Sequence, residues 1–373
     1  MTEVDSEPNQ PIKIGIITHE DFAVKHAPPY PRPSFISFES PLRIKVILDY
    51  FKRIKLWKDK RLLKFEPSLV KEELLYLAHS KYYVQSVKEL CNYSTSFLRE
   101  EVFIVNDSFE LARRAAGGVI QAIDCVLKKK VNHSFALVRP PGHHALRQCA
   151  GGLCIFNNIA LAILNLRKNL NYHKKVAIID IDDHFGDGIA QYFYDDPSVL
   201  YFSVHEFDFS GDLGFINELG VDKGLGKNIN FPMPMGIRDS EFLQFFDVLK
   251  PILKEFQPDL ILVATGFDMY FDDAIGNCFL TSKSYYKFAQ RLKSLADQLC
   301  EGRLVFVLEG GYSLVGLPLC VHATLKALLN EEYVAYEFEL IKFPTAVEIN
   351  EISKIKATLK KLLKNYWLSF DEK

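Results

Sequence analysis

Four apolar runs that each end in polar or glycine-rich residues constrain this chain more than any other feature. They read KVAIIDID (175–182), VLYFSVHE (199–206), LILVATGFD (260–268) and LVFVLEGGY (304–312). Such near-continuous hydrophobicity is typical of strands covered on both faces, as in a parallel sheet flanked by helices. Ligands of these sheets bind beyond the carboxyl ends of the strands, where the polar residues of the runs lie. The sequence therefore predicts an α/β fold with a mostly parallel central sheet and a site at one of its edges.

Apolar residues at helical spacing predict helices between these runs and before them. We expect a first strand at 12–18 and helices over 43–54, 69–90, 108–128 and 156–168. Residues 1–11 are polar and acidic, which predicts a disordered leader. The segment 331–373 is Lys-rich on one face and is predicted to be a C-terminal helical extension packed on the domain that precedes it.

Charge balance and cysteine spacing argue against several classes of protein. The chain has 45 Lys and Arg against 47 Asp and Glu, a net charge of −2, so no strong field draws it to nucleic acid or to a membrane surface. Its seven cysteines lack C-x-x-C spacing, so neither a disulfide framework nor a thiolate zinc site is signalled. The first apolar run is too short for a signal sequence or a membrane span. We therefore expect an intracellular, cytoplasmic protein without a nucleic-acid or membrane partner.

The stretch DIDDHFGDG (180–188) gathers acids and a histidine where a strand leaves the sheet. Residues two apart project to the same side, so Asp180, Asp182 and His184 share one direction. These groups suit a divalent cation, whereas the simpler reading, a helix cap, requires only one acid. Asp268, after another strand, completes two oxygens and one nitrogen with Asp182 and His184, the open three-ligand pattern of a catalytic zinc. Asp183 points the other way and is predicted to be a cap or a surface residue.

Two adjacent histidines, His143 and His144, follow a third strand in RPPGHHA (139–145). Amide hydrolysis at neutral pH needs one group that takes a proton from water and one that gives a proton to the leaving amine. The histidines fit these roles better than a structural role or a second metal site. Each needs a carboxylate to fix its tautomer, and Asp180 and Asp187 are spare acids. Tyr312, after two glycines, either packs or donates to a developing oxyanion.

Together these motifs resemble the zinc-dependent histone deacetylase family, which includes acetylpolyamine amidohydrolases and acetoin-utilisation proteins. RPPGHHA, CIFNN, DIDDHFGDG, GFD followed by LT, and LEGGY occur in the order and approximate spacing of that family, and FESPLR and LAHSKYYVQSV resemble its N-terminal signatures. The resemblance implies an arginase-like three-layer α/β/α sandwich and a deacetylase catalytic domain over 12–330. It also implies hydrolysis of the acetyl or related acyl amide of a protein lysine.

The resemblance assigns roles to individual residues of this chain. One zinc ion would be bound by Asp182, His184 and Asp268. The acid/base pair would be His143, backed by Asp180, and His144, backed by Asp187, while Tyr312 would polarise the acetyl carbonyl. A structural potassium ion would be bound by the carbonyls of Asp180, Asp182, His184 and Val204 and by the side-chain oxygen of Ser203. Substrate contacts would come from Gly152, Leu153, Glu101 and Ile275.

Three departures from the family pattern bear on the substrate. Phe185 stands where the family usually has a second histidine, and we expect its ring to point away from the metal into apolar packing. Leu153 replaces an aromatic wall of the acyl-lysine tunnel, which predicts a wider channel that admits a longer acyl chain. The aromatic residues after SVHE leave the other tunnel wall open between three candidates, Phe207, Phe209 and Phe215.

Other readings stay open from the sequence. An acetylpolyamine or small-amide hydrolase on the same fold would favour acidic residues at the entrance, and HEFDFSGDLGFINELG (205–220) is acidic enough to keep that alternative. A two-manganese ureohydrolase would need a further bridging aspartate within HFGDG (184–188). A non-catalytic acyl-lysine binding protein would be suggested by loss of a metal ligand or of Tyr312, and all of these are present.

Overall fold

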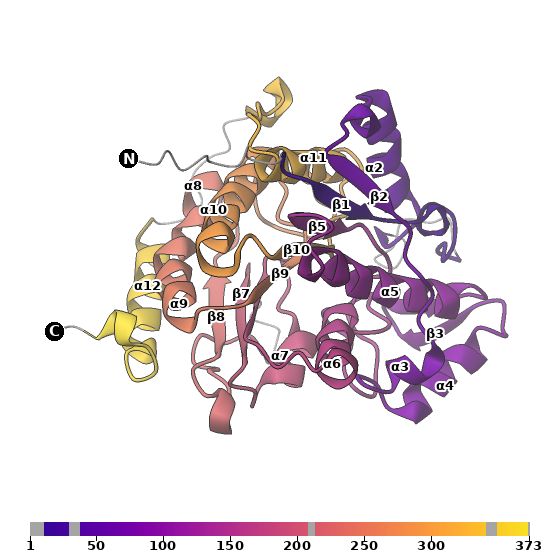
Figure 1. The fold of residues 1–373 in the computed structure, drawn as a ribbon, viewed down its shortest axis with the longest axis horizontal. Coiled ribbons are helices and arrows are strands. Elements are labelled where there is room, and N and C mark those ends of the chain that lie inside the picture. The colour runs from indigo at the N-terminus through magenta and orange to yellow at the C-terminus, as the bar shows by residue number, and fades with distance from the viewer. Residues whose placement is uncertain (1–10, 30–37, 208–212, 341–348, 372–373) are drawn as a thin grey trace, which may run out of the picture.

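The computed structural model of this chain describes residues 11–29, 38–207, 213–340 and 349–371, and its centre is an eight-stranded sheet (Figure 1). The strand order is β2-β1-β5-β10-β9-β6-β7-β8, and every neighbouring pair is parallel. The strands are β1 (Ile14–Ile17), β2 (Leu62–Phe65), β5 (His133–Ala136), β6 (Val176–Asp180), β7 (Val199–Glu206), β8 (Asn228–Met233), β9 (Leu260–Thr265) and β10 (Leu304–Leu308). A separate antiparallel hairpin joins β3 (Ser96–Arg99) to β4 (Val102–Ile104).

Helices surround this sheet, as a parallel sheet requires (Figure 1). They are α2 (Leu42–Arg53), α3 (Glu72–Leu75), α4 (Lys81–Leu90), α5 (Ser108–Leu127), α6 (Asn158–Leu170), α7 (Asp187–Phe193), α8 (Asp239–Phe242), α9 (Phe246–Phe256), α10 (Ser282–Cys300), α11 (Gly316–Leu328) and α12 (Ile349–Leu363). Short 3-10 turns are η1 (Glu20–Ala23), η2 (Leu56–Lys58), η3 (Asp222–Gly224), η4 (Leu243–Phe245), η5 (Glu337–Leu340) and η6 (Leu368–Phe370). The predicted α/β/α class with a mostly parallel sheet is confirmed.

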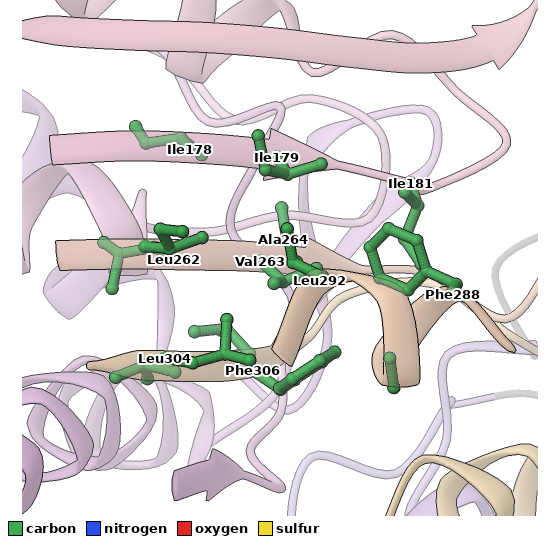
Figure 2. Close-up of a cluster of buried hydrophobic side chains, with 14 of the residues drawn as sticks. Ile178, Ile179, Ile181, Leu262, Val263, Ala264, Phe288, Leu292, Leu304 and Phe306 are labelled. Atoms are coloured by element: carbon green, nitrogen blue, oxygen red, sulfur yellow. The ribbon is translucent and has the colours of Figure 1, made fainter. Parts of the chain in front are cut away.

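The core lies where β6, β9 and β10 run side by side under α10 (Figure 2). Ile178 and Leu262 are register partners on adjacent strands, and Phe288 of α10 packs against Phe306 of β10 on the opposite face of the sheet, with ring centroids 6.4 Å apart. These side chains are fully or almost fully buried. Burying an aliphatic or aromatic side chain of this size stabilises a fold by about 1.5–3 kcal/mol. The apolar runs are therefore buried on both faces, as their lack of alternation predicts.

One predicted helix is broken in two. Residues 69–90 show continuous helical spacing, but the chain forms α3 and α4 with a turn between them. Ser80 begins α4 as its N-cap, because its hydroxyl accepts the backbone N–H of Tyr83 at 3.2 Å. The backbone N–H of Ser80 donates instead to the carbonyl of Arg147, 67 residues further along the chain. This tertiary hydrogen bond explains why the helical pattern alone set the wrong boundary.

The C-terminal segment packs against the edge of the sheet. Helix α12 contacts α9 and β8, and Figure 1 places it at that side of the molecule. Beyond it, the indole N–H of Trp367 donates to the carbonyl of Gly226 at 2.9 Å, and the Lys227 ammonium lies 3.9 Å from the ring centroid. These contacts accord with a packed extension, and the boundaries after residues 11 and 330 stay predictions. The leader falls almost wholly outside the described residues.

The strand order brings the polar strand ends together. Strands β5, β10, β9 and β6 are consecutive neighbours, and all four run in the same direction. The loops that leave their carboxyl ends carry the paired histidines, Tyr312, Asp268 and the DIDDHFGDG stretch, respectively. Residues that lie as much as 169 positions apart in sequence therefore meet at one edge of the sheet.

Candidate active site

Asp182, His184 and Asp268 form a compact cluster of possible metal ligands. One donor atom from each residue lies within 4.8 Å of the others. The His184 Nδ1 atom lies 3.2 Å from Asp182 Oδ1 and 3.5 Å from Asp268 Oδ2. Both acids are buried, whereas the His184 side chain is 41% exposed, so the cluster opens on the histidine side. The structure thus brings together the three residues that the sequence predicts as metal ligands.

The donor set fits a divalent cation. Among the described residues, the buried Asp268 Oδ2 accepts no hydrogen bond and has only the His184 ring at 3.5 Å as an ionic neighbour, whereas its other oxygen accepts the backbone N–H of Asp183 at 2.9 Å. Asp182 is oriented by the N–H groups of His184 at 3.0 Å and Gly310 at 2.7 Å. A Cβ atom on Gly310 would lie 2.1 Å from Asp268 Oδ2, so only glycine fits there. An unpaired buried carboxylate oxygen is unfavourable unless a cation or proton binds it.

The electrostatics of the cluster reflect crowded negative charge. Burial and the neighbouring Asp182 carboxylate raise the pKa of Asp268 to about 7, against the opposing effect of His184. Burial disfavours a charged His184, but the hydrogen bond to Asp182 and the nearby Asp268 carboxylate raise the pKa of its imidazole well above 6.5. A metal ion and protons therefore compete for the same three side chains.

The paired histidines lie beside this cluster with different electrostatic environments. His143 Nδ1 lies 3.3 Å from Asp180 Oδ2, and His144 Nδ1 lies 2.8 Å from Asp187 Oδ1, which are the predicted pairings. Although burial opposes it, Asp182 and Asp180 raise the pKa of His143 to about 10. Burial and the neighbouring His143 lower the pKa of His144 below 6.5. The surroundings of the two imidazoles thus shift their pKa values in opposite directions.

Several buried groups that position this pair are not evident from the motifs alone. The Tyr201 hydroxyl donates to Asp180 Oδ2 at 2.9 Å, the oxygen that faces His143. Glu309 Oε2 accepts the backbone N–H groups of Gly142 at 2.6 Å and His143 at 3.1 Å, which fixes the loop. Glu309 stands directly before Gly310 in LEGGY, so its place at a strand end was the available signal.

Tyr312 lies on a turn that other side chains hold in place. Asp273 Oδ2 accepts the backbone N–H groups of Tyr312 at 2.6 Å and Ser313 at 2.9 Å. The Arg43 guanidinium lies 4.8 Å from the Tyr312 ring centroid, and Arg43 also donates to the Gly311 carbonyl at 2.7 Å. Burial raises the pKa of the Tyr312 hydroxyl well above 10. The phenol therefore keeps its proton and remains a hydrogen-bond donor.

Gly152 and Leu153 form a two-residue hairpin against His144. The Gly151 carbonyl accepts the N–H of Cys154 at 2.8 Å, and the two central residues have φ of +50° and +67°. A Cβ atom on Gly152 would lie 2.0 Å from His144 Cδ2, so glycine lets the backbone approach the ring. Leu153, a non-glycine residue in this conformation, is strained, and such strain is typical of functional sites.

The two other predicted substrate contacts, Glu101 and Ile275, lie on separate loops that are hydrogen-bonded to residues of the site. Glu101, in the β3–β4 hairpin, accepts the backbone N–H of Gly152 at 3.3 Å. The Ile275 N–H donates to Asp273 Oδ1 at 3.0 Å, and Asp273 is the residue that holds Tyr312. Both side chains thus belong to loops that are directly connected to the site.

The Phe185 ring packs against Tyr201, His205 and Gly214. Its centroid lies 5.1 Å from that of His205 and 6.2 Å from that of Tyr201, and it covers Gly214. Of the candidate tunnel aromatics, Phe207 and Phe215 contact each other at 6.0 Å between centroids. Phe209 lies outside the described residues.

Comparison with known proteins identifies the family. A model of the histone deacetylase domain matches residues 37–328. The chain belongs to the histone deacetylase family. It is 33% identical to a probable deacetylase of Archaeoglobus fulgidus, over 81% of this chain and 82% of that protein. The crystal structure of the HDA15 HD domain matches with a TM-score of 0.83 at 26% identity, over 96% of this chain and 97% of that one.

Two eukaryotic relatives are named for different substrates. The chain is 38% identical to the polyamine deacetylase HDAC10 of Danio rerio and to the histone deacetylase HDA1 of Saccharomyces cerevisiae, over 70% of this chain. It spans only 40% and 38% of their lengths. Family membership makes this chain a hydrolase acting on amides, with zinc as the family's metal and acetylated molecules as substrates in general. No helix among the described residues is long and apolar enough to cross a bilayer.

Proposed function

We propose that this chain hydrolyses the acetyl or related acyl amide of protein lysine, with one zinc ion on Asp182, His184 and Asp268. The observation that carries the proposal is the compact set of donor atoms from these three residues, with His143 Nε2 at 3.7 Å from Asp182 Oδ1 and a histidine pair whose pKa values are shifted in opposite directions. When bound, zinc supplies Lewis-acid polarisation of the substrate carbonyl and of a water molecule.

His144 is proposed as the general base. Its Nδ1–H donates to the Asp187 carboxylate, which leaves Nε2 as a proton acceptor. Its lowered pKa keeps the ring neutral near pH 7. His143, with a raised pKa, holds a proton for the leaving amine, and the Asp180 carboxylate stabilises the charged imidazolium. The two roles follow from the neighbours of each ring.

Tyr312 is proposed to donate to the oxyanion that develops on the substrate carbonyl. Its hydroxyl keeps its proton at neutral pH, and its backbone is fixed by Asp273. A preorganised donor of this kind stabilises a tetrahedral oxyanion without reorganisation during the reaction. The Gly152 carbonyl, on the hairpin that contacts His144, is proposed to accept the substrate amide N–H.

The proposed potassium ion would bind behind the metal cluster. His205 Nε2 lies 3.0 Å from the Gly214 carbonyl and so must donate there, which makes Nδ1 an acceptor. Ser203, 2.8 Å from Nδ1, therefore uses its hydroxyl proton on His205 and keeps its oxygen lone pairs free for a cation. The carbonyls of Asp180, Asp182, His184 and Val204 are the proposed further ligands.

The alternative function, hydrolysis of acetylpolyamines or other small amides, differs from the proposed function in its substrate. An acetylpolyamine carries cationic amines, which favour carboxylates at the entrance. Ile275, on the loop that Asp273 connects to Tyr312, is apolar and suits a lysine side chain on a peptide, whereas Glu101 is an acid that accepts a hydrogen bond from the Gly152 hairpin. Leu153 in place of an aromatic wall is proposed to admit acyl chains longer than acetyl.

Comparison of kcat/KM for an acetyl-lysine peptide and for acetylspermidine tests this proposal. We expect the peptide to be preferred by at least about tenfold. A preference for acetylspermidine would replace the peptide substrate with the polyamine alternative. Equal or better activity on acetyl than on butyryl peptides would contradict the wide channel assigned to Leu153.

A further inference from the structure

Asp183 is a buried acid that the proposed mechanism does not use. It was expected to be a cap or a surface residue, but it is only 4% exposed. No Lys, Arg or His side chain forms an ion pair with it among the described residues, and its carboxylate accepts a hydrogen bond from the Cys278 thiol. A buried carboxyl group in such a place either keeps its proton or binds a cation. Asp183 is therefore a buried acid without a basic partner in the described part of the chain, and its surroundings decide whether a cation fits.

A second set of metal donors surrounds this carboxylate. Asp183, Glu206 and Cys278 each offer one atom, and these atoms lie within 4.8 Å of one another. The Cys278 Sγ atom lies 3.5 Å from Asp183 Oδ1. A tetrahedral zinc ion with a Zn–S bond of about 2.3 Å and a Zn–O bond of about 2.0 Å separates those two ligand atoms by about 3.5 Å.

Backbone and side-chain hydrogen bonds hold the three donors in place. The Glu206 N–H donates to the Asp183 carbonyl at 2.8 Å, which joins the end of β7 to the loop after β6. Asn277, next to Cys278, donates to the Glu206 carboxylate from its backbone N–H at 3.3 Å and from its side-chain amide at 3.1 Å. Glu206 is half-buried, which gives an ion and a water ligand access. The cluster is therefore preorganised before any ion arrives.

We propose that Asp183, Glu206 and Cys278 form a second zinc site, separate from the Asp182, His184 and Asp268 cluster. One thiolate and two carboxylates are a donor set that zinc accepts, with water as the fourth ligand. Binding forms a Zn–S bond and releases the thiol proton to solvent.

The site would also support the catalytic cluster. The Asp183 backbone N–H donates to Asp268 Oδ1 at 2.9 Å, so an ion that fixes Asp183 also fixes the orientation of Asp268. Cys278 lies on the loop between Asp268 and α10, which also carries Ile275. The proposed ion thus acts as a positioning group for the loop that carries a catalytic ligand.

Cobalt(II) titration of the metal-free full-length chain tests the site. The catalytic cluster contains no thiolate, so a thiolate-to-cobalt charge-transfer band reports on a cysteine ligand alone. We expect two bound cobalt ions per chain and this band in the wild type. Cys278→Ser is expected to bind one cobalt ion and to lose the band, while Cys125→Ser and Cys320→Ser, which change buried thiols outside the cluster, keep both.

Glu206→Gln is a milder variant that keeps the shape of a half-buried side chain. It is expected to weaken binding of the second cobalt ion by at least about tenfold while the first ion binds normally. If Cys278→Ser fails to fold, cobalt binding by Glu206→Gln and by the wild type still tests whether the second site exists. Saturation of the wild type at one cobalt ion without the band, or a band that persists in Cys278→Ser, would overturn the proposal. Failure of deacetylation with two ions still bound would instead contradict only the proposed function.

Discussion

Replacement of Tyr312 by phenylalanine separates the chemistry of its hydroxyl from its role in packing. The Arg43 guanidinium contacts the ring, at 4.8 Å from the centroid, and Asp273 holds the backbone N–H at 2.6 Å. Phenylalanine keeps both contacts and removes only the hydroxyl. We therefore expect the free energy of unfolding to change by less than about 1 kcal/mol.

The expected catalytic effect of Tyr312→Phe is much larger. Loss of one oxyanion donor costs about 2.7–4 kcal/mol of transition-state stabilisation, or roughly a hundredfold to a thousandfold in kcat. Steady-state kinetics on an acyl-lysine peptide, with zinc content measured by elemental analysis, gives the answer. Tyr333→Phe is a matched control, because its hydroxyl donates to Ser282 away from the site. A Tyr312→Phe enzyme with near-normal kcat, or one that has lost its zinc, would refute the assigned role.

Three further perturbations probe the surroundings of the site. Gly152→Ala places a Cβ atom 2.0 Å from His144 Cδ2. We therefore expect kcat to fall by at least about tenfold while the circular dichroism spectrum stays native. An unchanged kcat would contradict the close approach of the Gly152 backbone to the His144 ring. Asp273→Asn places an amide NH₂ group opposite a backbone N–H that the carboxylate now accepts. The free energy of unfolding in urea should fall by about 1–3 kcal/mol, and kcat should also fall. A fully active and equally stable variant would contradict the role of Asp273 in holding the Tyr312 turn. His26 and His79 are buried, and burial lowers the pKa of each to about 3, so the unfolded state binds more protons below pH 6.5. Stability should therefore fall by about 1.4 kcal/mol per pH unit for each histidine between pH 6.5 and about 3, and urea unfolding that is independent of pH across this range would be inconsistent with neutral buried rings.

Local pattern was enough to predict the sheet and the main chemical groups. The strand ends are readable because an apolar run and the polar residues after it are adjacent in sequence, as at Asp182 and Asp268. The parallel topology then requires those ends to meet, which is why both acids and His184 form one cluster.

What the sequence did not reveal depends on distant partners. Arg139, which precedes the paired histidines, is buried against Glu39, 100 residues earlier, at 2.7 Å. Neither residue carries a local signal of that ion pair. The interpretation of Asp183 as a cap or a surface residue was wrong, because Asp183 is buried and its carboxylate contacts Cys278, 95 residues away. Residue spacing alone cannot predict the environment of a side chain whose neighbours come from a distant part of the sequence.

Dependence of deacetylation on metal at Asp268 tests the central proposal most directly. The measurement is hydrolysis of an acetyl-lysine peptide by the purified full-length chain before chelation, after chelation and after zinc is restored, in the wild type and in Asp268→Asn. The proposal predicts activity that chelation abolishes and zinc restores in the wild type, and no recovery in the variant. Activity that survives complete removal of metal, or an Asp268→Asn enzyme that zinc restores fully, would contradict it.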